Sequence, residues 1–231
     1  MSQFLKCLVI FFLPFSLYAQ ISNAEFSNDQ TVRIASGTFK SYSGVDGSPY
    51  VPSETPKKGW LVSQNKIVPA ELRYNTYSGE VEYLQNGKLV KPMIPITEFF
   101  ILAPDTMSFQ NGYPAINKNT SSDFYQVLYD GSKTKLLRRL LSSTKTNNDA
   151  MSSNYGKKTI RNYEEYYAWQ AGQTAATKLS DGTMHFIAIT KKELLGLFPQ
   201  QQEIIDEYLK STNLKLKTWV DFAQVLAFLK Q

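Results

Sequence analysis

The stretch ELRYNTYSGEVEYLQNGKLVK (residues 71–91) decides the fold, because it places two tight turns between segments of alternating polarity. Asn86-Gly87 is the strongest short-range hairpin signal, since both residues tolerate positive φ. A two-residue turn there pairs the flanking residues, Gln85 with Lys88, Leu84 with Leu89, Tyr83 with Val90 and Glu82 with Lys91. The stretch therefore predicts a three-stranded antiparallel meander.

The alternation within this meander predicts one apolar face and one charged, solvent-exposed face. The apolar set is Val68, Leu72, Tyr74, Val81, Tyr83 and Val90, and the charged set is Glu71, Arg73, Glu80, Glu82 and Lys91. In a hydrolase, two carboxyl groups face each other across a cleft and one of them has a raised pKa. Glutamates that are exposed beside basic residues lack this arrangement, so Glu80 and Glu82 do not suggest a hydrolase. Tyr77 falls in the turn or on the charged face, where an exposed ring is a candidate for binding.

Strand patterns continue on both sides of the meander. Residues 31–40 alternate, 96–102 are almost continuously apolar, and 125–141 repeat the hairpin pattern around Asp130-Gly131. In LLRRLL (136–141) the apolar pairs also fit a helical period, but the Asp-Gly turn favours a partner strand. Residues 159–170 and 183–190 predict two more strands, and the polar stretches 41–58 and 142–158 predict long loops.

The last forty residues change to a helical period. Thr190 and Glu193 form a capping-box pattern, Pro199 restarts a helix, and Thr218 opens a third. We therefore predict an α+β fold, an antiparallel, curved β-sheet or partly open β-barrel with two or three short C-terminal helices. The expected organisation is a signal peptide at 1–19, a polar segment with one strand and a loop at 20–58, a β-rich domain at 59–189, and helices at 190–231 packed on that domain.

The first nineteen residues have the pattern of a bacterial export signal. Lys6 precedes a short apolar run broken by Pro14, and Ala19 is a small residue at the expected cleavage site. Cys7, the only cysteine, lies inside this segment, so the pattern is not that of a lipoprotein. We expect a periplasmic or extracellular protein with no transmembrane segment in the mature chain.

Composition argues against several classes of function. The formal net charge is only +5 and the basic residues are scattered, which argues against nucleic acid as a partner. His185, the only histidine, lies in an apolar strand without a ligand cluster. We therefore expect no metal and no cofactor.

Two groups of residues are candidates for contact with a ligand or partner. Aromatic side chains crowd one predicted strand on both of its faces, so either a second layer covers one face or some rings bind a ligand or partner. With the turn residue, this set is Tyr77, Tyr163, Tyr166, Tyr167 and Trp169. A basic group could contact anionic surfaces or block edge-to-edge association, and comprises Lys133, Lys135, Arg138 and Arg139.

The signal ending in Ala-Gln, the segments LRYN…GEVEYLQNG and FYQVLYDGSKTKLLRR, and the ending KKELLGLFP…EYLK together resemble a group of uncharacterised exported proteins common in Bacteroidota. The resemblance covers most of the chain from about Gly59. It implies a Gram-negative envelope setting and carries over no catalytic residue, ligand or activity.

These observations favour a non-enzymatic module that binds a partner protein or an envelope component. The alternative is a protein that binds a glycan or lipid on an aromatic-lined curved sheet. A third hypothesis is an unrecognised hydrolase, which requires two buried carboxylates across a cleft.

Overall fold

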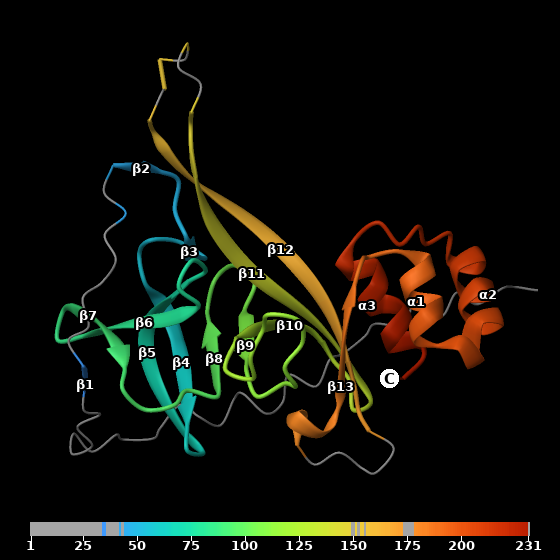
Figure 1. Cartoon of the computed structure of the whole chain (residues 1–231). Helices are drawn as coiled ribbons and strands as arrows, with labels where there is room; N and C mark the ends of the chain where they lie inside the picture. Colours follow the sequence, from blue (N-terminus) through green and yellow to red (C-terminus); the bar gives the residue numbers. More distant parts are fainter. Residues whose placement is uncertain are drawn as a thin grey trace, which may run out of the picture. The chain divides into compact units, whose positions relative to one another are not determined.

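The computed structural model describes residues 34–35, 42, 44–148, 151, 153–154, 156–172 and 178–230 (Figure 1). The predicted signal peptide and residues 20–33 lie outside these ranges. Thirteen strands form one sheet in the described part of the chain. Their bounds are β1 Ile34–Ala35, β2 Val45–Asp46, β3 Tyr50–Val51, β4 Lys57–Ser63, β5 Lys66–Asn75, β6 Glu80–Gln85, β7 Lys88–Pro92, β8 Glu98–Ile101, β9 Met107–Gln110, β10 Tyr125–Asp130, β11 Thr134–Thr146, β12 Lys158–Gln170 and β13 Thr183–Ile187.

The sheet is open and mixed. Its strand order is β1-β7-β6-β5-β4-β8-β9-β10-β11-β12-β13, with β2 paired to β12 and β3 paired to β5. The order does not return to its first strand, so the sheet is not a closed barrel. The pairing of β2 with β12 is parallel, which corrects the expectation of an entirely antiparallel sheet.

The meander predicted from residues 71–91 is confirmed. Leu72 is paired with Tyr83, and Tyr83 with Val90, in the register that the turn at Asn86-Gly87 requires. Asn86 and Gly87 have φ of 51° and 73°, values that suit these two residue types. Lys91 forms its ion pair with Glu80, at 2.6 Å, rather than with Glu82.

The charged face of the meander is solvent-exposed at Glu71, but the prediction is wrong for Arg73 and Glu82, which are covered. Glu82 is 1% exposed and lies 2.7 Å from the guanidinium of Arg73. The ring of Tyr50 lies 3.6 Å from Arg73 Cζ, and the backbone oxygen of Glu54 accepts a hydrogen bond from the same guanidinium. Residues 50–54 therefore cover this ion pair. The stretch 41–58 was predicted to be a loop, but it contains β2, β3 and the start of β4.

Apolar side chains form three clusters on the sheet. The first, around Leu72, Phe99 and Phe109, lies under β4 to β9. The second contains Tyr125, Tyr167 and Trp169 from β10 and β12. Leu137 belongs to this cluster and Leu136 to the third, which faces the helices, so residues 136–141 form a strand and not a helix.

The C-terminal helices are α1 Lys191–Leu197, α2 Gln202–Thr212 and α3 Trp219–Phe228, with a 3-10 turn at Pro199–Gln201. Thr190 accepts a hydrogen bond from Glu193 N, and Thr218 forms a complete capping box with Asp221. The third cluster packs these helices on β11, β12 and β13 through Leu136, Ala168 and Ile187 (Figure 1). No helix in the described ranges combines the length and the apolarity needed to cross a bilayer.

Candidate partner-binding groove at the edge of β12

The backbone groups of β12 point to two different edges, an inner edge that pairs with β11 and an outer edge on the opposite side. Ala171 N donates a hydrogen bond to Lys133 O, and Asn147 N donates one to Lys157 O, both between the two strands of the β11–β12 hairpin. Alternate residues of a strand direct their N–H and C=O groups to opposite neighbours. Odd-numbered residues of β12 therefore bond to β11, and even-numbered residues direct these groups to the outer edge.

In the described chain, partner strands cover the outer edge of β12 only at its two ends, and between them Asn162 Nδ2 donates a hydrogen bond to Ser48 O. β13 pairs with Tyr166–Gln170, and β2 pairs with Lys158 and Thr159. Between them, no strand of the described chain pairs with residues 160–165 on this side. The outward N–H and C=O groups of Asn162 and Glu164 make no backbone hydrogen bond within the described ranges, so they form a short open strand edge.

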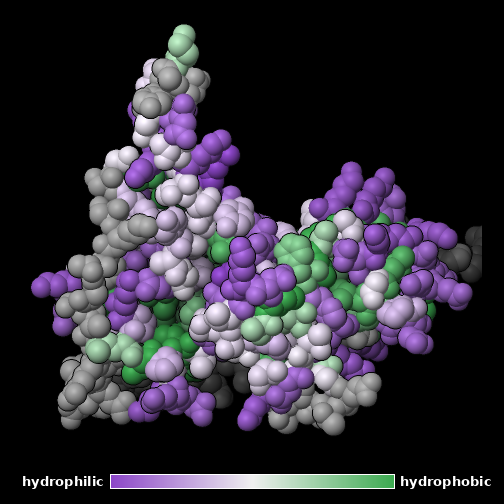
Figure 2. Space-filling model, viewed as in Figure 1, coloured by the Kyte–Doolittle hydropathy of each residue, from purple (hydrophilic) through white to green (hydrophobic). Residues whose placement is uncertain are grey.

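A groove of about 680 Å³ adjoins this open edge. It lies where β13 leaves the sheet and α3 begins, and Figure 2 shows hydrophobic side chains at the surface between β12 and α3. Its lining residues belong to three segments, namely Glu164–Tyr166, Phe186–Ile189 and Lys217–Val220. Phe186 is 55% exposed and Val220 44% exposed, which leaves apolar surface available to a partner.

Fixed charges form one wall of the groove. Arg138 holds Glu164 at 3.0 Å, and the hydroxyl of Tyr166 donates to the same carboxylate at 2.6 Å. Burial, and then the bond to Glu164, raises the pKa of Tyr166 above its ordinary value. Lys217 lies on the other side, at the start of α3. These contacts orient Tyr166 and leave the groove with charges of both signs.

The predicted aromatic residues do not form one surface. Tyr163 is 46% exposed and Tyr166 is half-buried at the groove, whereas Tyr167 and Trp169 are 2% and 3% exposed. The hydroxyl of Tyr167 donates to Glu165, and the indole of Trp169 donates to Leu179 O. Tyr167 and Trp169 are therefore core residues, because Tyr113, Tyr125 and Leu179 pack on their face of β12.

Tyr77 is not among the residues that line the groove. It follows β5, where Asn75 Oδ1 accepts a hydrogen bond from its backbone N–H. Its ring is half-buried and packs edge-on against Tyr42, with ring centres 5.9 Å apart. The structure therefore gives Tyr77 a packing role in the turn.

The predicted basic group is divided between the two faces of β11. Arg138 bonds to Gln126 and Glu164 on one face, while Arg139 bonds to Asp123 at 2.8 Å on the other. Lys135 forms an ion pair with Asp130 and is half-buried, and its pKa is lowered by that burial. Lys133 is exposed. Three of the four cations thus already have partners within the chain.

The described residues contain no group of three or more metal-ligating side chains. Glu164 and Glu165 are adjacent on a strand and direct their carboxylates to opposite faces, to Arg138 and Tyr167 respectively. Glu82 is buried but paired with Arg73. None of these carboxylates faces a second one across a cleft, which is the arrangement that glycoside hydrolysis needs.

Sequence reasoning missed Phe186 and Val220. Phe186 shares a face of β13 with the buried Met184 and pairs with the buried Tyr167, so alternation alone predicts a buried side chain and gives no signal of its exposure. Val220 shares the first turn of α3 with Trp219, and its exposure depends on how the helix packs on the sheet.

Comparison of the chain with protein-family models, with curated proteins and with solved structures gives no match. The function of the groove therefore has to be argued from its own residues.

Proposed function

We propose that this chain is an exported, non-enzymatic module that binds a partner protein by accepting an extended segment along the open edge of β12. The observation that carries the proposal is the combination of the outward backbone groups of Asn162 and Glu164 with exposed Phe186 and Val220 in one groove. Strand addition uses both parts, because main-chain hydrogen bonds supply affinity and side-chain pockets supply specificity.

The covered ends of the edge set the length of the bound segment. β2 and β13 leave residues 160–165 without a partner strand, a span of about 20 Å for an extended chain, and residues 47 and 48 adjoin its start at Ile160 and Asn162. The groove continues from this edge toward α3. A short partner segment beside Glu164, with an apolar side chain directed into the groove that Phe186 and Val220 line, matches this space.

The small-ligand alternative receives less support. The rings that would line a cavity on the inner face of β12 pack against one another, with Tyr125 and Tyr167 centres 5.2 Å apart and Tyr113 and Tyr125 centres 5.5 Å apart. Tyr113, Tyr125 and Tyr167 are almost fully buried. A filled core at this place favours a surface interaction.

The envelope setting rests on the sequence. The pattern of residues 1–19 is that of an export signal, and the hairpin segments resemble exported proteins of Bacteroidota. The proposed export separates the protein from substrates in the cytosol, which fits a role in assembly or attachment. An open strand edge is a suitable contact for that role.

Photo-crosslinking in cells tests the proposal. A benzophenone amino acid at Phe186 should give a covalent adduct with a partner protein, because the side chain lies in the groove. The same amino acid at Ile67, which is 49% exposed on β5, is the matched control and should give none. Equal labelling from both positions, or no adduct from position 186, would contradict the proposal.

A further inference from the structure

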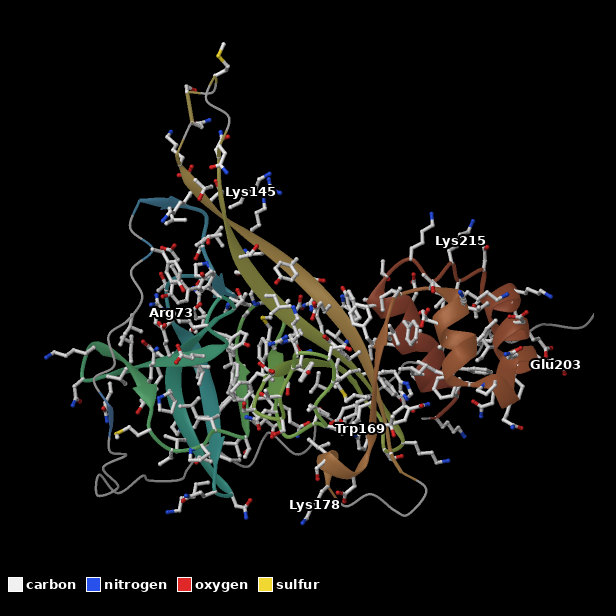
Figure 3. The ribbon with its side chains drawn as sticks, viewed as in Figure 1. Arg73, Lys145, Trp169, Lys178, Glu203 and Lys215 are labelled. Atoms are coloured by element: carbon white, nitrogen blue, oxygen red, sulfur yellow. The ribbon has the colours of Figure 1, made fainter. Side chains whose placement is uncertain are left out.

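A second recess lies nearer the turn of the β11–β12 hairpin. Its volume is about 350 Å³, and its lining comprises Asp46, Lys145, Asn147, Asn154, Lys157, Thr159 and Arg161. Figure 3 labels Lys145 on this part of the hairpin, and Figure 2 shows hydrophilic side chains gathered there. The recess shares no residue with the groove beside α3.

The register places three cations on one face of the hairpin. Lys145 is directly opposite Thr159 of β12, and Lys157, just before β12, and Arg161, within it, lie two positions before and after Thr159. Both are therefore diagonal neighbours of Lys145, at about 7–8 Å between α-carbons. Long basic side chains at this spacing can reach a common point above Thr159.

These cations lack an acidic partner in the described part of the chain. None of the ion pairs there includes Lys145, Lys157 or Arg161. Among the described residues that line the recess, Asp46 on β2 is the only acidic one. Like charges on neighbouring strand positions repel one another, so the arrangement favours an external anion between them.

The backbone around the recess is held in place. Gly156 N donates to Asn147 O at 2.8 Å, and Lys157 N donates to Asn154 O at 3.1 Å, which closes the end of the hairpin. β2 pairs with Lys158 and Thr159 and forms the remaining wall. The three cations therefore project from an ordered frame.

We propose that this recess binds a tetrahedral oxyanion, a phosphate or sulfate group carried by an envelope component. The two ammonium groups and the guanidinium supply charge and donors, since Arg matches the geometry of such oxygens and Lys acts as a point charge. The hydroxyl of Thr159 supplies one more donor. This site is independent of partner binding at the groove and differs from the basic group at 133–139.

Titration with inorganic phosphate tests the site. In amide spectra of the protein at constant ionic strength, phosphate should shift the signals of Thr159 and Arg161 saturably, while chloride should not. Lys145→Gln should weaken this binding about fivefold or more, because one of three charges near the anion is lost. Asp46→Asn should strengthen it, because the opposing charge disappears.

Lys158→Gln is the matched control. Lys158 is exposed and adjacent in sequence, but it projects from the other face of β12, so its removal changes the net charge equally without touching the recess. Phosphate binding by this variant should equal that of the wild type. Equal weakening in Lys158→Gln and Lys145→Gln, or the lack of a saturable shift in the wild type, would overturn the proposal.

Vesicles distinguish the two sources of the anion. Sedimentation with phosphatidylcholine vesicles containing phosphatidic acid, lost in Lys145→Gln and competed by phosphate, would identify a lipid headgroup as the ligand. Phosphate binding without vesicle binding would identify a soluble phosphate or sulfate ester. Vesicle binding that Lys145→Gln and Lys158→Gln reduce equally would contradict the site, because general charge would then explain it.

Discussion

At the residue scale, Arg73 and Glu82 show how tertiary contacts change the role of a side chain. Their positions on β5 and β6 pair them across the strands, as the sequence predicts. The segment that includes Tyr50 then covers the pair, so that Arg73 and Glu82 side chains are only 11% and 2% exposed. The contact that was predicted at the surface is a buried ion pair. Removing one of its two residues leaves the other charge buried without a partner.

Replacing Arg73 alone should therefore destabilise the protein strongly. Arg73→Met leaves the carboxylate of Glu82 buried and unpaired, which we expect to lower the free energy of unfolding by about 3 kcal/mol. The double variant Arg73→Met/Glu82→Leu should recover most of this loss, because no buried charge remains. Urea unfolding measures both values.

The exposed ion pair of Lys91 and Glu80 is the control for this cycle. Glu80 is 43% exposed in its side chain, so Lys91→Met should cost less than about 1 kcal/mol. A loss in Lys91→Met equal to that in Arg73→Met would show that burial does not set the energy of the Arg73–Glu82 pair.

At the element scale, the two edges of β12 differ in how far partner strands cover them. Odd-numbered residues bond to β11 along the full length of the strand, whereas even-numbered residues have a partner strand only near the ends. β12 thus stabilises the sheet through one edge, and the other edge is the one at which we propose that a partner binds. The same strand also separates the helix-facing cluster from the cluster around Tyr125.

Proline substitutions at two adjacent positions test this division. Glu165→Pro removes the N–H that bonds to β11 opposite Arg139, so it should lower the free energy of unfolding by about 2 kcal/mol more than Glu164→Pro. Glu164→Pro removes an outward N–H and should leave a folded protein that loses the adduct from position 186.

Glu164→Gln is the control for the second effect, because it removes the charge paired with Arg138 but keeps the backbone N–H. It should keep the adduct. If Glu164→Pro kept the adduct as well, the bound segment would not add to the edge of β12.

At the scale of the whole molecule, the helices and the sheet belong to one compact unit, Arg33–Gln231. Phe222 of α3 is fully buried in the cluster that also holds Leu136 and Ile187 of the sheet. The helical layer covers one face of β11 to β13 and also forms one side of the groove. Its packing therefore determines both stability and the position of Val220.

Phe222→Ala should lower the free energy of unfolding by about 3–5 kcal/mol through lost burial and a cavity. Because the cluster joins the layers, helical circular dichroism and tryptophan fluorescence should shift together in one transition. Phe228→Ala, at a residue that is 44% exposed on the same helix, should cost much less. Two separate transitions in Phe222→Ala would show that the helices unfold independently.

The sequence by itself determined the local elements of this protein. The meander, the strand at 136–141 and the three C-terminal helices follow from turn chemistry, residue alternation and capping, which act between residues close in the chain. Tyr163 and Tyr166 were also identified as surface candidates, because their strand is unusually rich in aromatic residues. All of these features are local.

Only the tertiary structure decided which faces and edges remain open. The burial of Glu82, the core positions of Tyr167 and Trp169, and the exposure of Phe186 depend on segments far away in the chain. The groove lies where β13 ends and α3 begins beside β12, and the basic recess lies where β2 pairs with β12. Alternation assigns a residue to a face, but only the packing of distant segments decides whether that face is covered.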